Sequence, residues 1–190
     1  MSELGYKVSG IDVEKDSIDY ASQHYDAEFS VCDVNQAHQL IDQQFDIFTL
    51  FNSFYAFEDQ AAALRSLAGI AKPDAKLMIF DYTDLNGDIS QNPLYRKHGK
   101  GITAFYPIDL HSIKSMLSHN GWQLDEIVDI TDQYDQWYTD LLIQLFAKKN
   151  DIVEQFGRDA FAKTLHRYSS ILQSIYEDKS GGAIIYAHKA

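Results

Sequence analysis

The sequence of 190 residues has few of the features that mark secreted, membrane-spanning or nucleic-acid-binding proteins. Cys32 is the single cysteine, so no disulfide can form within the chain, which suits a reducing compartment. No apolar run reaches the roughly 18 residues that span a bilayer, and the first residues show no signal-peptide pattern. The 16 basic residues are outnumbered by 28 acidic ones, and the net charge of -12 repels phosphates and anionic membranes. We therefore expect a cytoplasmic protein with no nucleic-acid or membrane partner.

Short motifs of several enzyme classes are also missing. There is no G-x-S-x-G elbow and no G-x-x-x-x-G-K phosphate loop, and the seven histidines show no paired metal spacing on a helix. Asp84, Asn86 and Asp88 imitate the start of a calcium loop, but Ile89 and Tyr95 stand where Gly and Glu are required. A solvated loop is the better interpretation there, and we expect no metal site.

The first half of the sequence alternates short apolar runs with helical patterns. Apolar runs predict strands at 7–11, 28–32, 45–51 and 76–80. Helical spacing predicts helices at 14–24, 35–41 and 58–71. The run Phe45–Phe51 is continuously apolar after its Asp, which is typical of a strand buried on both faces. Because strands and helices alternate with short links, we predict an α/β fold with a mostly parallel, Rossmann-like sheet.

The second half has a different organisation. Residues 83–107 form a long irregular connection, of the kind that often serves as a lid or binding loop. A helix at 108–120 is expected to end in a left-handed cap at Asn120-Gly121, followed by a strand at 122–131. A helical stretch at 136–176, broken near Gly157, precedes a last strand at 183–188. No domain boundary is evident, so we predict that residues 1–190 form one domain, with the helical stretch inserted over the sheet edge.

Polar side chains follow the predicted strands, at the edge where open parallel sheets bind their ligands. Asp12 could accept two hydrogen bonds from a ribose diol, but a solvated Asp that opens the next helix is an equal alternative. Asp33 could hold an adenine amine, although an N-cap or Asx turn is favoured on local grounds. Asn52 follows Phe51 and is either a simple turn or a polar contact for a cofactor. Tyr55 more often belongs to a core, but aromatic faces also attract sulfonium or ammonium cations.

Four segments, in this order, resemble class I S-adenosylmethionine-dependent methyltransferases. They are Leu4–Asp12 (LGYKVSGID), Val31–Asp33 (VCD), Phe45–Phe51 (FDIFTLF) and Ala71–Tyr82 (AKPDAKLMIFDY). The first is similar to the family's second strand, the second to its acidic adenine motif, and the others to its fourth and fifth strands. In the last segment the family usually has two glycines after the proline. The later part of the chain loosely resembles the phosphoethanolamine methyltransferase branch, at Asp81-Tyr82, Tyr106–Ile108 and Asp129–Tyr134.

The resemblance implies S-adenosylmethionine as cofactor and a small-molecule methyl acceptor. The residues that it implies for the cofactor are Asp12, Val13, Cys32, Asp33, Val34, Phe51 and Asn52. Those that it implies for the acceptor are Tyr55, Asp81, Tyr82 and Tyr106. No general base can be identified from the sequence, so the catalytic residues stay unassigned.

The chain departs from the family at its front, where the family has a first strand and a G-x-G-x-G loop. Glycine is needed in that loop because a side chain would block the approach of the backbone to the cofactor. Without this strand, we expect its neighbours in the sheet to keep unpaired backbone groups. A truncated record, a complementing chain and a degenerate relative that no longer binds cofactor all remain open. The functional alternatives are a non-catalytic interaction module and one part of a split enzyme, and a nicotinamide-dependent oxidoreductase is the least favoured function. The chain could also form a homo-oligomer.

Overall fold

The computed structural model describes residues 2–87 and 105–190. Its strands are β1 (Ser9–Asp12), β2 (Glu28–Val31), β3 (Phe45–Phe51), β4 (Ala71–Asp84), β5 (Ile108–Asp109), β6 (Trp122–Asp129) and β7 (Ser180–Lys189). Its α-helices are α1 (Lys15–His24), α2 (Ala37–Leu40), α3 (Gln60–Gly69), α5 (Ile113–His119), α6 (Thr131–Ala147), α7 (Lys149–Phe156) and α8 (Arg158–Tyr176). Single 3-10 turns are η1 (Ser2–Leu4), η2 (Val34–Gln36) and η3 (Phe54–Ala56). Asp88, Ile89 and Tyr95 of the predicted connection at 83–107 lie outside the described residues.

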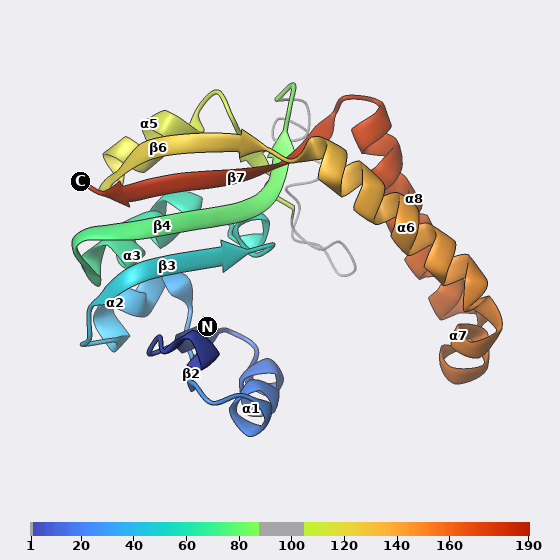
Figure 1. Ribbon diagram of the computed structural model, residues 1–190, viewed down its shortest axis with the longest axis horizontal. Helices are drawn as coiled ribbons and strands as arrows, with labels where there is room; N and C mark the ends of the chain where they lie inside the picture. The colour runs from blue at the N-terminus through green and yellow to red at the C-terminus, as the bar shows by residue number, and fades with distance from the viewer. Residues whose placement is uncertain (1, 88–104) are drawn as a thin grey trace.

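The strands form two sheets, which Figure 1 shows side by side. β1 and β2 pair in parallel as a separate two-stranded sheet. The larger sheet has the order β3-β4-β7-β6, with β5 added to the end of β4. β3 and β4 are parallel, and β7 runs antiparallel to both β4 and β6. The predicted α/β fold with a mostly parallel sheet is confirmed, and only β7 among the described strands of the larger sheet is reversed.

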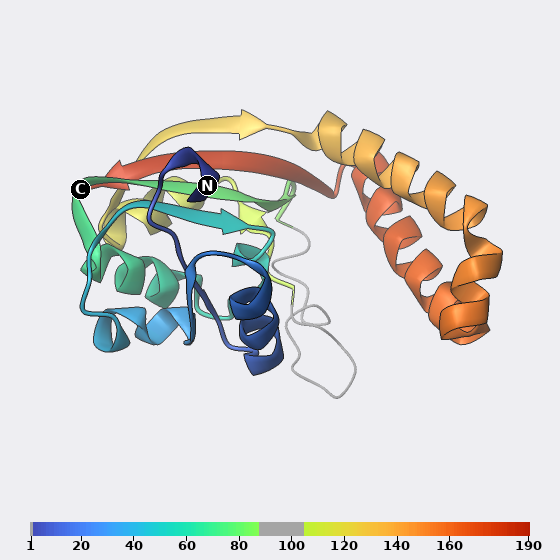
Figure 2. The ribbon, with the colours of Figure 1, turned by 60° about the horizontal axis from the view of Figure 1, so that its bottom comes forward.

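One face of the larger sheet carries most of the hydrophobic core. Phe48, Leu77, Ile79, Ile185 and Trp122 are all buried in one cluster. In Figure 2, α2, α3 and α5 lie on this side of the sheet. The Trp122 indole donates a hydrogen bond to the Leu64 carbonyl at 2.9 Å, so the buried N–H has a partner in α3. This packing fixes the strand ends where the candidate site residues lie.

The opposite face of the larger sheet is apolar but poorly covered. Ile47 and Phe51 of β3 are 43% and 57% exposed, and Tyr186 of β7 is also exposed. The expectation that β3 is buried on both faces is therefore wrong for the described part of the chain. Its sequence is that of a central strand, but β4 is its only described neighbour in the sheet.

Several element boundaries differ from the predicted ones for identifiable reasons. The helix expected at 108–120 begins only at Ile113, because Ile108 and Asp109 pair with the end of β4. It ends as predicted, with Gly121 at a φ of 86°. The predicted helical stretch begins earlier than 136, at Thr131, where the Asp129 carboxylate accepts the Thr131 N–H. It is broken at Lys148 as well as at Gly157.

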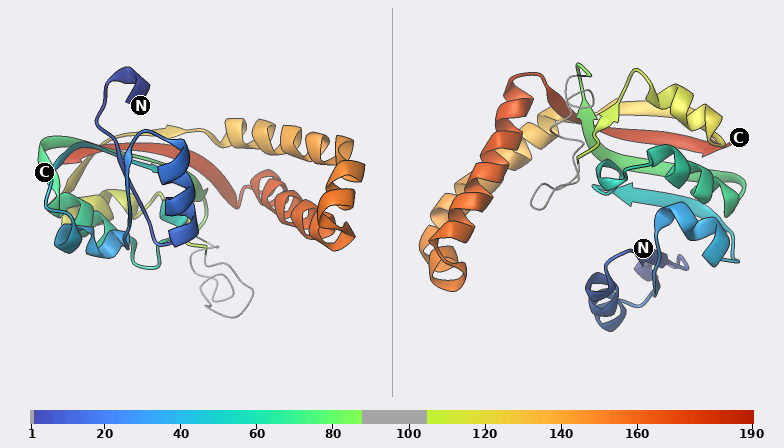
Figure 3. Two further views of the ribbon diagram at one scale, coloured as in Figure 1. Left: turned by 90° about the horizontal axis from the view of Figure 1, so that it is seen from below. Right: turned by 180° about the vertical axis from the view of Figure 1, so that it is seen from behind.

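The helical stretch does not lie over the sheet edge as predicted. α6 and α8 form an antiparallel pair that projects beyond the sheet, and α7 lies at its far end (Figures 1 and 3). Only the base of the pair packs against strands, where Tyr134 and Tyr138 contact Phe80 and Tyr82 of β4. None of the described helices is long and apolar enough to cross a membrane.

Candidate functional site

Asp12 and Asp33 lie at the carboxyl ends of neighbouring parallel strands, as the sequence predicts. The Cys32 N–H donates to the Asp12 carbonyl at 2.9 Å, which holds the two strand ends together. Asp12 is exposed, and its Oδ1 accepts the Glu14 N–H at 2.8 Å at the start of α1. Asp33 Oδ1 accepts the Asn35 N–H at 2.9 Å and caps η2, so the local N-cap interpretation is confirmed. Each carboxylate retains acceptor capacity for a further ligand.

Apolar side chains flank these two carboxylates. Val13 is 62% exposed beside Asp12, whereas Cys32 and Val34 are buried beside Asp33. Burial, helped by the neighbouring Asp33 carboxylate, raises the pKa of the Cys32 thiol. Cys32 is therefore a small packed side chain rather than a nucleophile, as the sequence indicates.

A second group of predicted residues lies at the carboxyl ends of β3 and β4. Asn52 adopts a φ of 45°, a left-handed conformation that Asn tolerates better than most residues and that recurs at functional sites. Its N–H donates to the Phe80 carbonyl at 2.8 Å, and its side-chain oxygen accepts the Tyr134 hydroxyl at 2.7 Å. The Phe51 ring packs on Phe80 and stays 57% exposed.

Asp81 is fully buried at the end of β4, and backbone N–H groups surround its carboxylate. Its Oδ2 accepts the Tyr55 N–H at 3.1 Å, and its Oδ1 accepts the Tyr82 N–H at 2.8 Å. Burial raises the pKa of this carboxyl to about 6, against the lowering effect of the surrounding N–H donors, of which Tyr82 contributes most. Asp81 therefore holds the segment after β3 against the end of β4 instead of facing an open pocket.

The predicted acceptor residues Tyr55, Tyr82 and Tyr106 are brought together around Asp81. The Tyr106 N–H donates to the Tyr55 carbonyl at 2.7 Å, and the rings of Tyr55 and Tyr82 meet edge to face at 5.2 Å. Phe105 packs against both rings. A cavity of about 910 Å³ opens beside Tyr106 and is also lined by Gln60 and Asp109. Tyr55, Tyr82 and Tyr106 are 24 to 51 positions apart in the sequence, so it is the fold that brings them together.

Sequence reasoning assigned no role to several aromatic residues of this region. Tyr134 stacks on Tyr82 at 5.2 Å between ring centroids, and the Tyr138 and Tyr82 hydroxyls are hydrogen-bonded. Burial raises the pKa of all three of these tyrosines, so their hydroxyls stay protonated at neutral pH. Tyr134 and Tyr138 lie four residues apart in α6, and residues at i and i+4 share one helix face. This spacing was the feature of the sequence that could have identified the pair.

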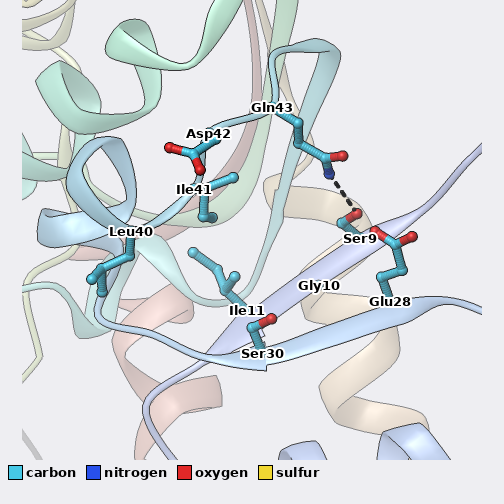
Figure 4. A pocket seen from close by; sticks show the side chains of 9 residues that line it. All are labelled: Ser9, Gly10, Ile11, Glu28, Ser30, Leu40, Ile41, Asp42 and Gln43. Carbon is cyan, nitrogen blue, oxygen red and sulfur yellow. Dashed lines mark hydrogen bonds between the residues drawn. The ribbon is translucent and has the colours of Figure 1, made fainter.

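The two groups of predicted residues remain apart among the described residues. No hydrogen bond or ring contact described in the structure joins Asp12 or Asp33 to Phe51 or Asn52. A cavity of about 300 Å³ lies along β1, between Ser9–Ile11 and Leu40–Gln43, and neither Asp12 nor Asp33 lines it (Figure 4). Within the described part of the chain, no group of three or more His, Cys, Asp or Glu side chains could hold a metal ion.

An α/β fold with polar residues at the carboxyl ends of its parallel strands is the arrangement that the resemblance to class I S-adenosylmethionine-dependent methyltransferases predicts. Residues 1–79 match the family described as "Methyltransferase domain", which agrees with the resemblance predicted from the sequence. No curated protein sequence matches the chain.

Three solved structures illustrate the shared fold. A protein from Galdieria sulphuraria, described as a sarcosine dimethylglycine methyltransferase, has a TM-score of 0.81 at 13% identity over 100% of this chain and 71% of its own. Phosphoethanolamine N-methyltransferase 2 from Haemonchus contortus has a TM-score of 0.83 at 18% identity over 99% of this chain and 45% of its own. The cyclopropane synthase MmaA2 from Mycobacterium tuberculosis has a TM-score of 0.79 at 11% identity, covering 96% and 70%. The chain thus spans less than half of the Haemonchus enzyme.

Proposed function

We propose that this domain takes part in the transfer of a methyl group from S-adenosylmethionine to a small-molecule acceptor. The observation that carries the proposal is the position of Asp12 and Asp33 at the ends of two adjacent parallel strands, within a methyltransferase fold. Two structures of Haemonchus phosphoethanolamine N-methyltransferase 2 hold S-adenosylhomocysteine or S-adenosyl-L-methionine, which supports the same cofactor here.

The side chains present fit an adenosine-bearing cofactor. Asp12 would accept hydrogen bonds from the two hydroxyls of a ribose, and Asp33 would accept one from the exocyclic adenine amine with its remaining lone pairs. Val13, Cys32 and Val34 give apolar contacts beside the base. Phe51 and Asn52 line the amino-acid end, where Asn52 is held by its bond to Tyr134.

The cofactor supplies an electrophilic methyl group on a sulfonium. Bound there, it would donate this methyl to a lone pair of the acceptor, and the electron pair of the broken sulfur–methyl bond would stay on sulfur. Any proton on the methylated atom would pass to solvent. Catalysis of such an in-line displacement rests mainly on alignment of the reactants and on exclusion of water. Tyr55, Tyr82 and Tyr106 are assigned to the acceptor side, where neutral aromatic faces favour a cationic centre. Asp81 acts through the backbone of Tyr55 and Tyr82.

The substrates named for two of the structurally similar proteins suggest a chemical class for the methyl acceptor. Two of them name amine substrates, namely sarcosine and dimethylglycine in one and phosphoethanolamine in the other. Because aromatic faces attract ammonium groups, a small amine is the first acceptor class to test.

Calorimetric titration with S-adenosylhomocysteine tests the cofactor assignment. Loss of a hydrogen bond to a charged group costs about 1.5–3 kcal/mol, so Asp12→Ala should weaken binding roughly 10- to 150-fold. Asp16→Ala removes another carboxylate, in the first turn of α1, and is the matched control that should leave binding unchanged. Equal binding by the Asp12→Ala variant and the parent would contradict the assignment. A protein that binds no cofactor but forms a stable complex with a partner would favour the non-catalytic alternative.

A further inference from the structure

Tyr134 connects the base of α6 to the cofactor side of the candidate site. It lies in the first turn of α6, and its hydroxyl donates to the side-chain oxygen of Asn52 at 2.7 Å, across 82 positions of the sequence. Asn52 follows β3, where the proposed function assigns it to the amino-acid end of the cofactor. The effect of this bond on Asn52 therefore bears on which chemical group the site recognises.

The Tyr134 ring is held on several sides. It stacks on Tyr82 with 5.2 Å between the ring centroids and an interplanar angle of 10°, and it meets the Phe80 ring at 5.7 Å. On β7, Gly182 leaves the space that the ring occupies, since a Cβ there would lie 1.7 Å from a ring atom. A buried ring that is packed in this way has little freedom to move.

The start of α6 is also tied to β7 through the backbone. The Ile130 N–H donates to the Gly182 carbonyl at 2.9 Å, and the Gly182 N–H donates to the Thr131 hydroxyl at 3.3 Å. Tyr134 follows within the same turn, and its N–H donates to the Ile130 carbonyl at 3.0 Å. The Tyr134 hydroxyl therefore has a fixed position relative to the strand ends.

Asn52 is held at its backbone and at one side of its amide. Its N–H donates to the Phe80 carbonyl at 2.8 Å, and its φ is 45°. The Asn52 side chain is exposed, so water could satisfy its amide without the bond to Tyr134. Among residues 2–87 and 105–190, no described hydrogen bond uses the NH2 group of this amide.

The Tyr134 hydroxyl determines which way the Asn52 amide is turned. Burial raises the pKa of this hydroxyl, so it stays protonated and acts as a donor. A buried donor requires an acceptor, and the acceptor that the described residues offer is the side-chain oxygen of Asn52. Because the amide oxygen is directed toward Tyr134, the NH2 group is directed away from it.

An NH2 group that is turned outward has a defined chemical preference. It donates hydrogen bonds and accepts none, so it suits a carboxylate and offers nothing to an ammonium group. Hydrogen bonds to a charged acceptor are also stronger than those between neutral groups. The amino-acid end of S-adenosylmethionine carries both a carboxylate and an amine, so the orientation of the amide selects between them.

We propose that Tyr134 is a positioning residue, which turns the NH2 group of Asn52 toward the carboxylate of the cofactor's amino-acid end. Tyr134 acts through Asn52 and makes no contact with the cofactor itself. This inference rests on the proposed function, because it requires an S-adenosyl ligand beyond the ends of β3 and β4. The competing explanation is that the bond serves only the buried hydroxyl of Tyr134, in which case it stabilises the fold without affecting ligand recognition.

Calorimetric titration with two ligands separates these explanations. S-adenosylhomocysteine carries the carboxylate, whereas S-adenosyl-3-thiopropylamine keeps the adenosine, the thioether and the amine but lacks the carboxylate. The ratio of their dissociation constants measures the preference for the carboxylate. Tyr134→Phe keeps the ring and releases the amide, so it should lower this preference roughly 2- to 10-fold and leave the affinity for the amine ligand unchanged.

Asn52→Asp tests the same step from the other side of the bond. Aspartate still accepts the Tyr134 hydroxyl and tolerates a positive φ, but it replaces the NH2 donor by a charged oxygen. The preference for the carboxylate should fall at least roughly 10-fold. Adding Tyr134→Phe to this variant should lower the preference no further, because the donor that Tyr134 orients is already absent.

Tyr168→Phe is the matched control. Its ring packs against Tyr138 in the same aromatic cluster, and no described hydrogen bond uses its hydroxyl. This variant should keep the parent's ratio of dissociation constants. Circular dichroism of all variants confirms that each is folded before titration.

The outcomes separate the positioning role from the proposed function. A Tyr134→Phe variant that is less stable than the parent but keeps its ratio would overturn the proposal and leave the bond a purely structural one. An Asn52→Asp variant that keeps the ratio would overturn it as well, because the NH2 group would then bind no carboxylate. If the folded parent binds neither ligand, the proposed function fails, and the carboxylate assignment fails with it.

Discussion

Asp81→Asn is the substitution whose effect follows most directly from the structure. The Asp81 side chain is fully buried, and burial raises the pKa of its carboxyl from 3.8 to about 6. Between these two pH values the folded protein binds more protons at this position than the unfolded chain does. The free energy of unfolding therefore falls as pH rises from about 4 to about 6, and then levels off.

The size of this effect follows from the shift. A difference of about two pKa units corresponds to about 3 kcal/mol of stability lost by the parent protein at neutral pH. Asparagine has nearly the same shape and, like the protonated acid, offers one acceptor oxygen to the N–H groups of Tyr55 and Tyr82. We expect the Asn variant and the parent to be equally stable near pH 4, and the variant to be more stable by up to about 3 kcal/mol at pH 7.

Urea unfolding at pH 4, 5, 6 and 7, followed by circular dichroism, measures the difference. Asp26→Asn changes an exposed carboxylate and should keep the parent's pH profile. A constant difference between Asp81→Asn and the parent at all four pH values would refute the reasoning. So would a parent that gains stability relative to the variant as pH rises. If the negative charge of Asp81 positions the Asn52–Tyr55 segment for binding, the Asp81→Asn variant should be more stable than the parent. The same variant should have a less ordered Asn52–Tyr55 segment and bind S-adenosylhomocysteine more weakly.

Three further predictions concern packing and reactivity. Gly182→Ala would place a Cβ 1.7 Å from the ring of Tyr134 and should lower the free energy of unfolding in urea by about 3 kcal/mol or more. Gly157→Ala is the control: the space around Gly157 is open, but its φ of 87° is strained for Ala, so the loss should be only about 1 kcal/mol. Tyr134→Phe removes the hydrogen bond to Asn52 and should lower the free energy of unfolding by about 1 kcal/mol; no change would mean that the bond is not formed. Cys32, buried and with a raised pKa, should react with a thiol reagent at pH 7.5 at least roughly 10-fold more slowly in the folded than in the urea-unfolded protein.

The exposure of β3 contrasts with its composition. β3 has the composition of a central strand, because Phe45–Phe51 is apolar on both faces. In the structure it has one described neighbour and one covered face. The apolar composition of β3 therefore did not predict how far each of its faces is covered in the structure.

The sequence by itself determined the features that depend on near neighbours in the chain. Hydrophobic periodicity located β1 to β3 closely and the central part of β4, which extends beyond the predicted residues 76–80 at both ends. Gly121 follows the end of α5, and the polar residues after each strand were recognised because parallel strands end at one edge. Tertiary structure alone decided the features that join distant segments. These are the burial of Asp81 under the Tyr55 backbone, the bond from Tyr134 to Asn52, and the pairing of β5 with β4. Side-chain burial and strand partners are set by which elements meet in space, and local propensities carry no information about that choice.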